Sequence, residues 1–241
     1  MRLSSNEQRV SGMPNAAETY EGEYGFWPWG MLLSFVADWI EKYAPANATV
    51  LDYMCGTGYL LNIVAQRRQD LRCFGCSLTP EYIHYAKRKY TKIQVDLCDA
   101  REYQPATRPD IVVCTAGLHH LPWNSQESFL QKVASELTTG KTFLLGEELI
   151  RRFTDEKERR MAVIEMNTEV LKYMTEKQAP ANILVTAADV LKADLAGLEY
   201  KIDKATIENM LSSNFQIDDQ IRFWPENEQG YGDHVFICQR R

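Results

Sequence analysis

The amino-acid sequence predicts an α/β fold with a doubly wound, mostly parallel sheet. Between residues 49 and 149, short apolar segments alternate with segments of helical periodicity. Strict alternation of this kind is typical of parallel strands joined by right-handed helical crossovers. A glycine turn at Gly56 and Gly58 joins the first strand to the next helix, as in open α/β sheets that bind nucleotides at the carboxyl ends of their strands. We therefore expect a ligand at that edge.

The sequence predicts seven strands in all, five in the core and two that close the sheet, with helices between them. The segment 110–115 is a continuous apolar run, as expected for a strand that is buried on both faces. Pro80 suits the first position of a helix, and Thr79 suits its cap. The expected strands are 49–53, 71–76, 93–97, 110–115, 142–147, 215–223 and 234–238, and the expected helices are 31–43, 59–68, from 79, 125–137, 155–177, 186–195 and 204–211.

These elements divide the chain into four parts. Residues 1–44 form an N-terminal flap and helix, and residues 45–150 form the ligand-binding core. Residues 151–200 are charged and helical with one apolar stripe, which indicates a helical lid inserted after the fifth strand. A helix pair that packs on the core or on a second chain is the alternative. Residues 201–241 supply a C-terminal helix and the closing strands.

The flap is rich in aromatic residues beside glycine and proline. Two interpretations stay open: the aromatic rings cover a flat apolar ligand, or they form an arm that covers the edge of the domain. The residues concerned are Tyr20, Tyr24, Phe26, Trp27 and Trp29.

Composition excludes several classes of function. The net charge of −6 argues against nucleic-acid and anionic-membrane partners, because both require a basic surface. The polar start has no apolar signal region, and no apolar run reaches about 18 residues, so we expect a soluble cytoplasmic protein. Cys73 and Cys76 lack a second pair at zinc spacing. The six cysteines are therefore interpreted as reduced core residues, and no metal is expected.

The order of residues in the glycine turn separates two kinds of nucleotide site. A dinucleotide motif requires a third glycine, where Leu61 stands, and an acid about twenty residues later. Here Asp52 precedes Gly56 and Gly58. The pattern resembles the first motif of class I S-adenosyl-L-methionine (SAM) dependent methyltransferases of the small-molecule type. An ordinary strand–helix turn with chance glycines is the alternative.

Three later segments extend the resemblance, which covers about residues 50–148. Ser77 stands where the family usually has a carboxylate for the ribose hydroxyls, Asp99 where an acid accepts from the adenine amino group, and Thr115 beside the methionine end. The resemblance implies a Rossmann-like seven-stranded sheet with an antiparallel last strand, and SAM as cofactor. The implied cofactor-binding residues are Asp52, Tyr53, Met54, Cys55, Gly56, Gly58, Ser77, Leu78, Asp99, Ala100, Thr115 and Ala116.

Two residues depart from the family pattern. Met54 stands where the family usually has glycine, so a flexible side chain lies near the amino-acid part of the ligand. Ser77 replaces the usual acid, and its hydroxyl can make one neutral hydrogen bond in place of two charge-assisted ones. Both departures bear on how the cofactor is held.

His119 and His120 follow the fourth strand and are the candidate catalytic bases, since imidazole titrates near neutral pH. A structural role is the alternative for both. The candidate substrate-binding residues are Tyr24, Trp27, Trp29, Glu147 and Arg151, although a solvated charged turn would equally explain the last two.

The predicted function is methyl transfer from SAM to a small-molecule acceptor, as in secondary metabolism, and a homodimer is left open. One alternative is transfer or cyclisation of the aminocarboxypropyl chain, which releases 5′-methylthioadenosine. Another is a non-catalytic SAM-binding module.

Overall fold

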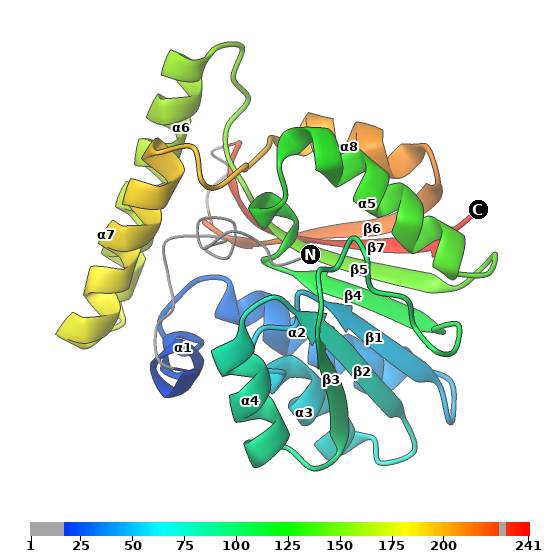
Figure 1. The fold of residues 1–241 in the computed structure, drawn as a ribbon. Helices are drawn as coiled ribbons and strands as arrows, with labels where there is room; N and C mark the ends of the chain where they lie inside the picture. The colour runs from blue at the N-terminus through cyan, green and yellow to red at the C-terminus, as the bar shows by residue number, and fades with distance from the viewer. Residues whose placement is uncertain (1–16, 227–229) are drawn as a thin grey trace, which may run out of the picture.

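The computed structural model describes residues 17–226 and 230–241, and it contains a seven-stranded sheet in the order β3-β2-β1-β4-β5-β7-β6 (Figure 1). Strands β1 to β5 pair in parallel, whereas β7 is antiparallel to both of its neighbours. The predicted fold class is thereby confirmed. The strands are β1 (Thr49–Tyr53), β2 (Arg72–Ser77), β3 (Ile93–Leu97), β4 (Ile111–Thr115), β5 (Thr142–Leu149), β6 (Phe215–Trp224) and β7 (Gly232–Arg240).

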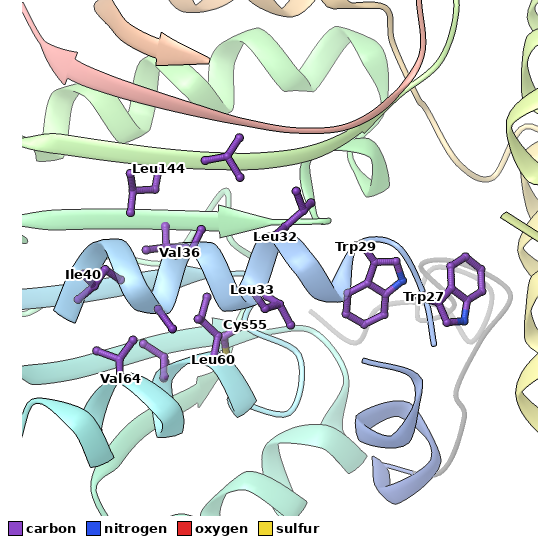
Figure 2. Close-up of a cluster of buried hydrophobic side chains, with 14 of the residues drawn as sticks. Trp27, Trp29, Leu32, Leu33, Val36, Ile40, Cys55, Leu60, Val64 and Leu144 are labelled. Atoms are coloured by element: carbon purple, nitrogen blue, oxygen red, sulfur yellow. The ribbon is translucent and has the colours of Figure 1, made fainter. Parts of the chain in front are cut away.

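Helices cover both faces of the sheet. One apolar cluster joins α2, α3 and α4 to one face, and a second cluster joins α5 and α8 to the other (Figure 1). Figure 2 shows part of the first cluster, with Leu32, Val36 and Ile40 of α2 buried beside Leu144 of β5. The helices are α1 (Ala17–Glu23), α2 (Gly30–Tyr43), α3 (Tyr59–Arg67), α4 (Pro80–Lys89), η1 (Leu118–His120), α5 (Trp123–Glu136), α6 (Glu156–Glu176), α7 (Ala181–Leu195) and α8 (Lys204–Ser212).

The helices α6 and α7 form an antiparallel pair to one side of the sheet (Figure 1). The apolar stripe expected on the first of them is buried, through Val163, Met166, Val170 and Met174. The pair joins the core through the flap, because Trp27 donates from Nε1 to the hydroxyl of Thr186 at 3.3 Å. The inserted helices therefore pack against the N-terminal segment.

Three local details differ from the expectations. Helix α1 and the short helix η1 were not predicted, because each is too short to show a helical period. The Thr79 side chain does not cap α4; the Ser77 hydroxyl instead accepts from the Thr79 backbone N–H at 3.5 Å.

All six cysteines are free, and five are buried, as expected. None of the helices in the described ranges has the length and apolar character needed to cross a membrane.

Candidate functional site

The backbone after β1 makes a tight left-handed turn. Met54, Gly56 and Gly58 have φ angles of +59°, +54° and +72°, in the region that favours glycine because a Cβ atom is crowded there. Gly58 immediately precedes α3, so the free N–H groups of that helix begin at the turn. The positive φ of Met54 explains why glycine is the usual residue at this position.

A small cavity lies at the carboxyl ends of β1 and β4, where ligands bind in open α/β sheets. Its wall combines residues from the flap, the glycine turn and the end of β4. The lining residues are Tyr20, Tyr24, Trp29, Leu33, Asp52, Met54, Cys55, Leu60, Thr115 and Ala116.

Asp52 is the acidic group of this cavity. Its side chain is buried, and the Oδ1 atom has no hydrogen-bond partner among the described residues. Burial raises the pKa of Asp52 well above its ordinary value. A buried acceptor without a donor is costly, so the cavity is suited to a ligand that brings an N–H donor, above all a cationic one.

Two tyrosines of the flap lie against the glycine turn. The Tyr20 ring stacks on Tyr82 with centroids 4.9 Å apart, and the Tyr24 ring stacks on Tyr59 at 4.5 Å. A Cβ atom added to Gly56 would lie 3.2 Å from the Tyr20 ring. The flap therefore closes the mouth of the cavity, and burial raises the pKa of both hydroxyl groups well above the usual value.

The residues implied for the nucleoside follow β2 and β3, which lie next to β1 in the sheet. Ser77 ends β2 and is buried. The Asp99 carboxylate accepts from the backbone N–H of Arg101 at 2.8 Å and from its Nε at 3.0 Å. Burial opposes ionisation of Asp99, but the contacts with Arg101 outweigh it and lower the pKa. An adenine amino group at Asp99 would share the carboxylate with Arg101.

His119 meets Glu147 on the other side of β4. Its Nδ1 lies 3.0 Å from the Glu147 carboxylate, which also accepts from the backbone N–H groups of Gly117 and His119. Burial disfavours a charged imidazole, but the Glu147 charge and hydrogen bond, with the charge of Glu148, raise the pKa of His119 to about 9. The ring is therefore protonated at neutral pH when this arrangement is intact.

His120 is half-buried, and its Nδ1 lies 2.7 Å from the Glu199 carboxylate. Burial raises the pKa of Glu199, but His120 and its neighbours outweigh this effect and lower it to about 2. The two imidazole rings lie 4.3 Å apart, edge to face. One ligand atom from each of His119, His120 and Glu199 lies within 4.8 Å of the others, so these three residues could hold a metal ion.

A buried ion cluster adjoins the histidines. The Nζ atom of Lys201, a residue only 2% exposed, lies 2.9 Å from Asp194 and 3.2 Å from Glu148. Asp233 of β7 lies opposite Glu148 of β5 in the strand register. Burial and the Glu148 charge raise the pKa of Asp233 well above its ordinary value.

The other candidate substrate residues have different surroundings. Trp29 and Tyr24 line the cavity, whereas Trp27 is buried against α7 and is not among the lining residues. Arg151 is half-exposed and pairs with Glu165 of α6 at 2.9 Å. Glu147 is buried beneath His119. Only two of the five are therefore on the cavity wall.

Sequence reasoning did not find Tyr20, Glu199, Lys201, Asp194 or Asp233 as site residues. Tyr20 is expected only as one of the flap aromatics, Asp194 falls in the expected helix 186–195, and the other three lie in polar or charged stretches without a motif. The turn at 196–197 after α7, which contains Gly197, is the one local signal of a change in chain direction before Glu199.

Known proteins resemble this chain in sequence and fold. Residues 50–140 match the family model described as a methyltransferase domain. The chain is 21% identical over 161 residues to the carboxy-S-adenosyl-L-methionine synthase of Campylobacter lari. The aligned region covers 64% of this chain and 69% of that protein.

Solved structures show the same fold at low identity. A plantazolicin methyltransferase aligns with a TM-score of 0.63 and 10% identity over 98% of this chain and 91% of its own. The magnesium protoporphyrin IX methyltransferase of Synechocystis PCC 6803 aligns with a TM-score of 0.57 and 14% identity over 99% and 92%. For mitomycin 7-O-methyltransferase the TM-score is 0.59, the identity is 16%, and coverage is 88% of this chain but only 53% of that one.

Proposed function

The chain carries a class I S-adenosylmethionine-dependent methyltransferase domain, and we propose that it transfers the methyl group of SAM to a small-molecule acceptor. The observation that carries the proposal is the buried Asp52 carboxylate, which lines the cavity behind the glycine turn and whose Oδ1 has no partner within residues 17–226 and 230–241. The methionine end of SAM bears an ammonium group, which supplies the missing donor and a compensating charge.

The remaining cofactor residues support one orientation of the ligand. The methionine end would lie between Asp52 and Thr115, because both line the cavity. The nucleoside would extend along the neighbouring strand ends toward Ser77 and Asp99. Tyr20 and Tyr24 would have to move or pack on the bound ligand, since they now lie over the glycine turn.

Methyl transfer from a sulfonium is an in-line displacement, so the protein mainly aligns the acceptor and excludes water. Trp27 and Trp29 of the flap share one buried apolar cluster with residues of α6 and α7, so an acceptor bound beside them would be shielded from water on that side. A base is needed only when the acceptor arrives protonated. In the protein without a bound cation, His120 is the more accessible of the two histidines, because it is half-buried whereas His119 is buried and held by Glu147.

Product identity tests the proposal. The protein would be incubated with SAM and a panel of small phenols, amines and carboxylic acids, and the nucleoside product would be identified by mass spectrometry. S-adenosylhomocysteine with a methylated acceptor is the expected result. Release of 5′-methylthioadenosine, or failure to bind SAM at millimolar concentration by calorimetry, would contradict methyl transfer.

One observation favours a second candidate function. The similarity to a protein named as a carboxy-S-adenosyl-L-methionine synthase supports a reaction in which SAM itself is altered. The departures at Met54 and Ser77, where the cofactor would be held, are consistent with this candidate. The same mass analysis separates it, because the nucleoside would then keep its methyl carbon and gain a carboxyl group taken from one of the carboxylic acids in the panel.

A further inference from the structure

Two histidines and a glutamate converge beside the cofactor cavity. His119 and His120 come from η1, and Glu199 comes from the segment after α7, 79 residues beyond His120. We propose that His119, His120 and Glu199 form a binding site for a divalent transition-metal ion, zinc or a close relative. Two imidazoles and one carboxylate are one of the donor sets of catalytic zinc sites, which keep a fourth position open.

The distances between the three candidate ligand atoms are close to those of such a site. The three candidate ligand atoms lie within 4.8 Å of one another, and His120 Nδ1 is 2.7 Å from Glu199. Donors bonded at about 2.0–2.1 Å to a tetrahedral ion lie about 3.3 Å apart. An ion would therefore separate His120 and Glu199 slightly, and any pair that lies wider than about 3.3 Å would have to close on it.

A second layer of contacts already orients one of the rings. Glu147 holds His119 at Nδ1, which leaves the Nε2 atom of the ring for an ion. A metal-ligating histidine usually donates its other ring N–H to a carboxylate in this manner. The backbone N–H groups of Gly117 and His119 also donate to Glu147, so the ring and its backbone are fixed together.

The third ligand is held in register with η1. The backbone N–H of Tyr200, the residue after Glu199, donates to the carbonyl of His119 at 2.7 Å. Gln126 is buried, and its Nε2 donates to the carbonyls of both Leu121 and Tyr200 at 3.0 and 2.8 Å. These contacts join two segments that are distant in the sequence, which gives a preorganised site rather than a chance meeting of side chains.

The charge of the surrounding interior also favours a cation. The nearby buried residues include one lysine, Lys201, and the buried imidazole of His119. A divalent ion would offset part of the negative charge of Glu147, Glu148 and Glu199, which lie at or next to the site. The buried acids are Glu147, Glu148, Asp194, Glu199 and Asp233.

The position of the site indicates its use, and this step rests on the proposed function. His119 and His120 follow Thr115 and Ala116, which line the cofactor cavity. Because His120 is only half-buried, the site is accessible from outside. A bound ion would hold an oxygen of the acceptor, a hydroxyl or a phenol, and lower its pKa. With the ion bound, both rings are ligands, so the ion replaces a histidine as the group that promotes deprotonation.

Metal binding can be tested without SAM or an acceptor. The full-length protein would be stripped with a chelator and titrated with Co²⁺ while its visible absorption is followed, and Zn²⁺ would then be added as a competitor. We expect one Co²⁺ per chain with the spectrum of a four- or five-coordinate ion, displaced by Zn²⁺. Absence of this spectrum at millimolar Co²⁺ would overturn the proposal.

Three variants assign the ligands. Glu199→Gln is nearly isosteric and should weaken Co²⁺ binding at least tenfold, and Glu147→Gln should weaken it about 10–100-fold through the orientation of His119. His84→Ala is the matched control, because His84 is exposed on α4 and far from the site in the fold. Circular dichroism would confirm that each variant is folded. Unchanged Co²⁺ affinity in Glu199→Gln, or a loss in His84→Ala as large, would refute the assignment.

The outcome is separable from that of the proposed function. Calorimetry with SAM alone tests the cofactor site, and Co²⁺ spectroscopy tests the metal site. A protein that binds SAM and yields S-adenosylhomocysteine but takes up no Co²⁺ would refute only the metal proposal. A protein that binds Co²⁺ through these residues but never binds SAM would refute only the methyl-transfer proposal.

Discussion

Glu147 and His119 are 28 residues apart in the sequence, yet the carboxylate of the first lies 3.0 Å from Nδ1 of the second in the interior of the protein. The same carboxylate accepts the backbone N–H of His119 at 3.2 Å. One residue at the end of β5 thus determines both the position and the protonation of the first histidine after β4. The pKa of His119 should therefore depend on the charge of Glu147.

Glu147→Gln should lower the pKa of His119 from about 9 toward the ordinary histidine value, because the amide carries no charge to stabilise an imidazolium. The measurement is an NMR pH titration of the His119 ring in metal-free protein. A His119 pKa that is unchanged by the substitution would contradict the assignment.

The same shift gives a pH dependence of stability. Because the folded protein binds the His119 proton more tightly than the unfolded chain, the associated stability is fully present below about pH 6.5. It should be lost as the pH rises through about 9. Urea unfolding from pH 6 to pH 10 measures it, and the loss should be smaller in Glu147→Gln than in the parent.

Asp52→Asn should weaken SAM binding by about 10–100-fold, because the ammonium group would lose a charge-assisted contact of about 1.5–3 kcal/mol. Isothermal calorimetry measures the affinity. Asp218→Asn removes the same charge from an exposed position of β6 and should leave the affinity unchanged. Equal affinities of the Asp52→Asn variant and the parent would place the methionine end of the cofactor elsewhere.

Lys201→Met should destabilise the fold by about 3–5 kcal/mol, because it leaves the buried Asp194 and Glu148 carboxylates without their cation. Lys192→Met breaks the exposed pair with Asp189 and should cost less than about 1 kcal/mol. Chemical denaturation at pH 7 compares the two variants. Similar losses in both would show that the Lys201 cluster is not held as a buried ion network.

Met54 offers a test of backbone strain. Its φ of +59° disfavours any residue with a Cβ atom, so Met54→Gly should be more stable than Met54→Ala by about 1 kcal/mol. Both variants lose the Met side chain, which leaves the backbone as the difference. The order should reverse for the same pair of substitutions at Met161, an exposed position in α6, because glycine weakens a helix by about 1 kcal/mol relative to alanine. Thermal or urea unfolding of the four variants provides the comparison.

Much of the fold could be predicted because its signals are local. The apolar runs of β1 and β4 and the helical stripe of α6 appear in consecutive residues, and β1 and β3 were predicted with their observed bounds. Helix α7 begins five residues earlier than expected, at Ala181 after Pro180. Its first turn contains no periodic signal strong enough to distinguish it from the preceding loop.

The candidate site was only partly predictable. Asp52, Gly56 and Gly58 form a contiguous motif, so their place beside the cavity followed from local order. Glu199 and Lys201 carried no such signal, since charged residues after a helix usually face solvent. Their burial results from the packing of the segment after α7 over η1, which joins residues about 80 positions apart.

The sequence by itself determined the α/β alternation, the glycine turn and the acid that precedes it, because hydrophobic periodicity and backbone freedom act over a few residues. The tertiary structure alone decided that Tyr20 lies over Gly56, that Glu147 holds His119 and that Glu199 meets His120. Those contacts depend on how the sheet order and the inserted helices bring distant segments together, and burial then sets the charge of each group.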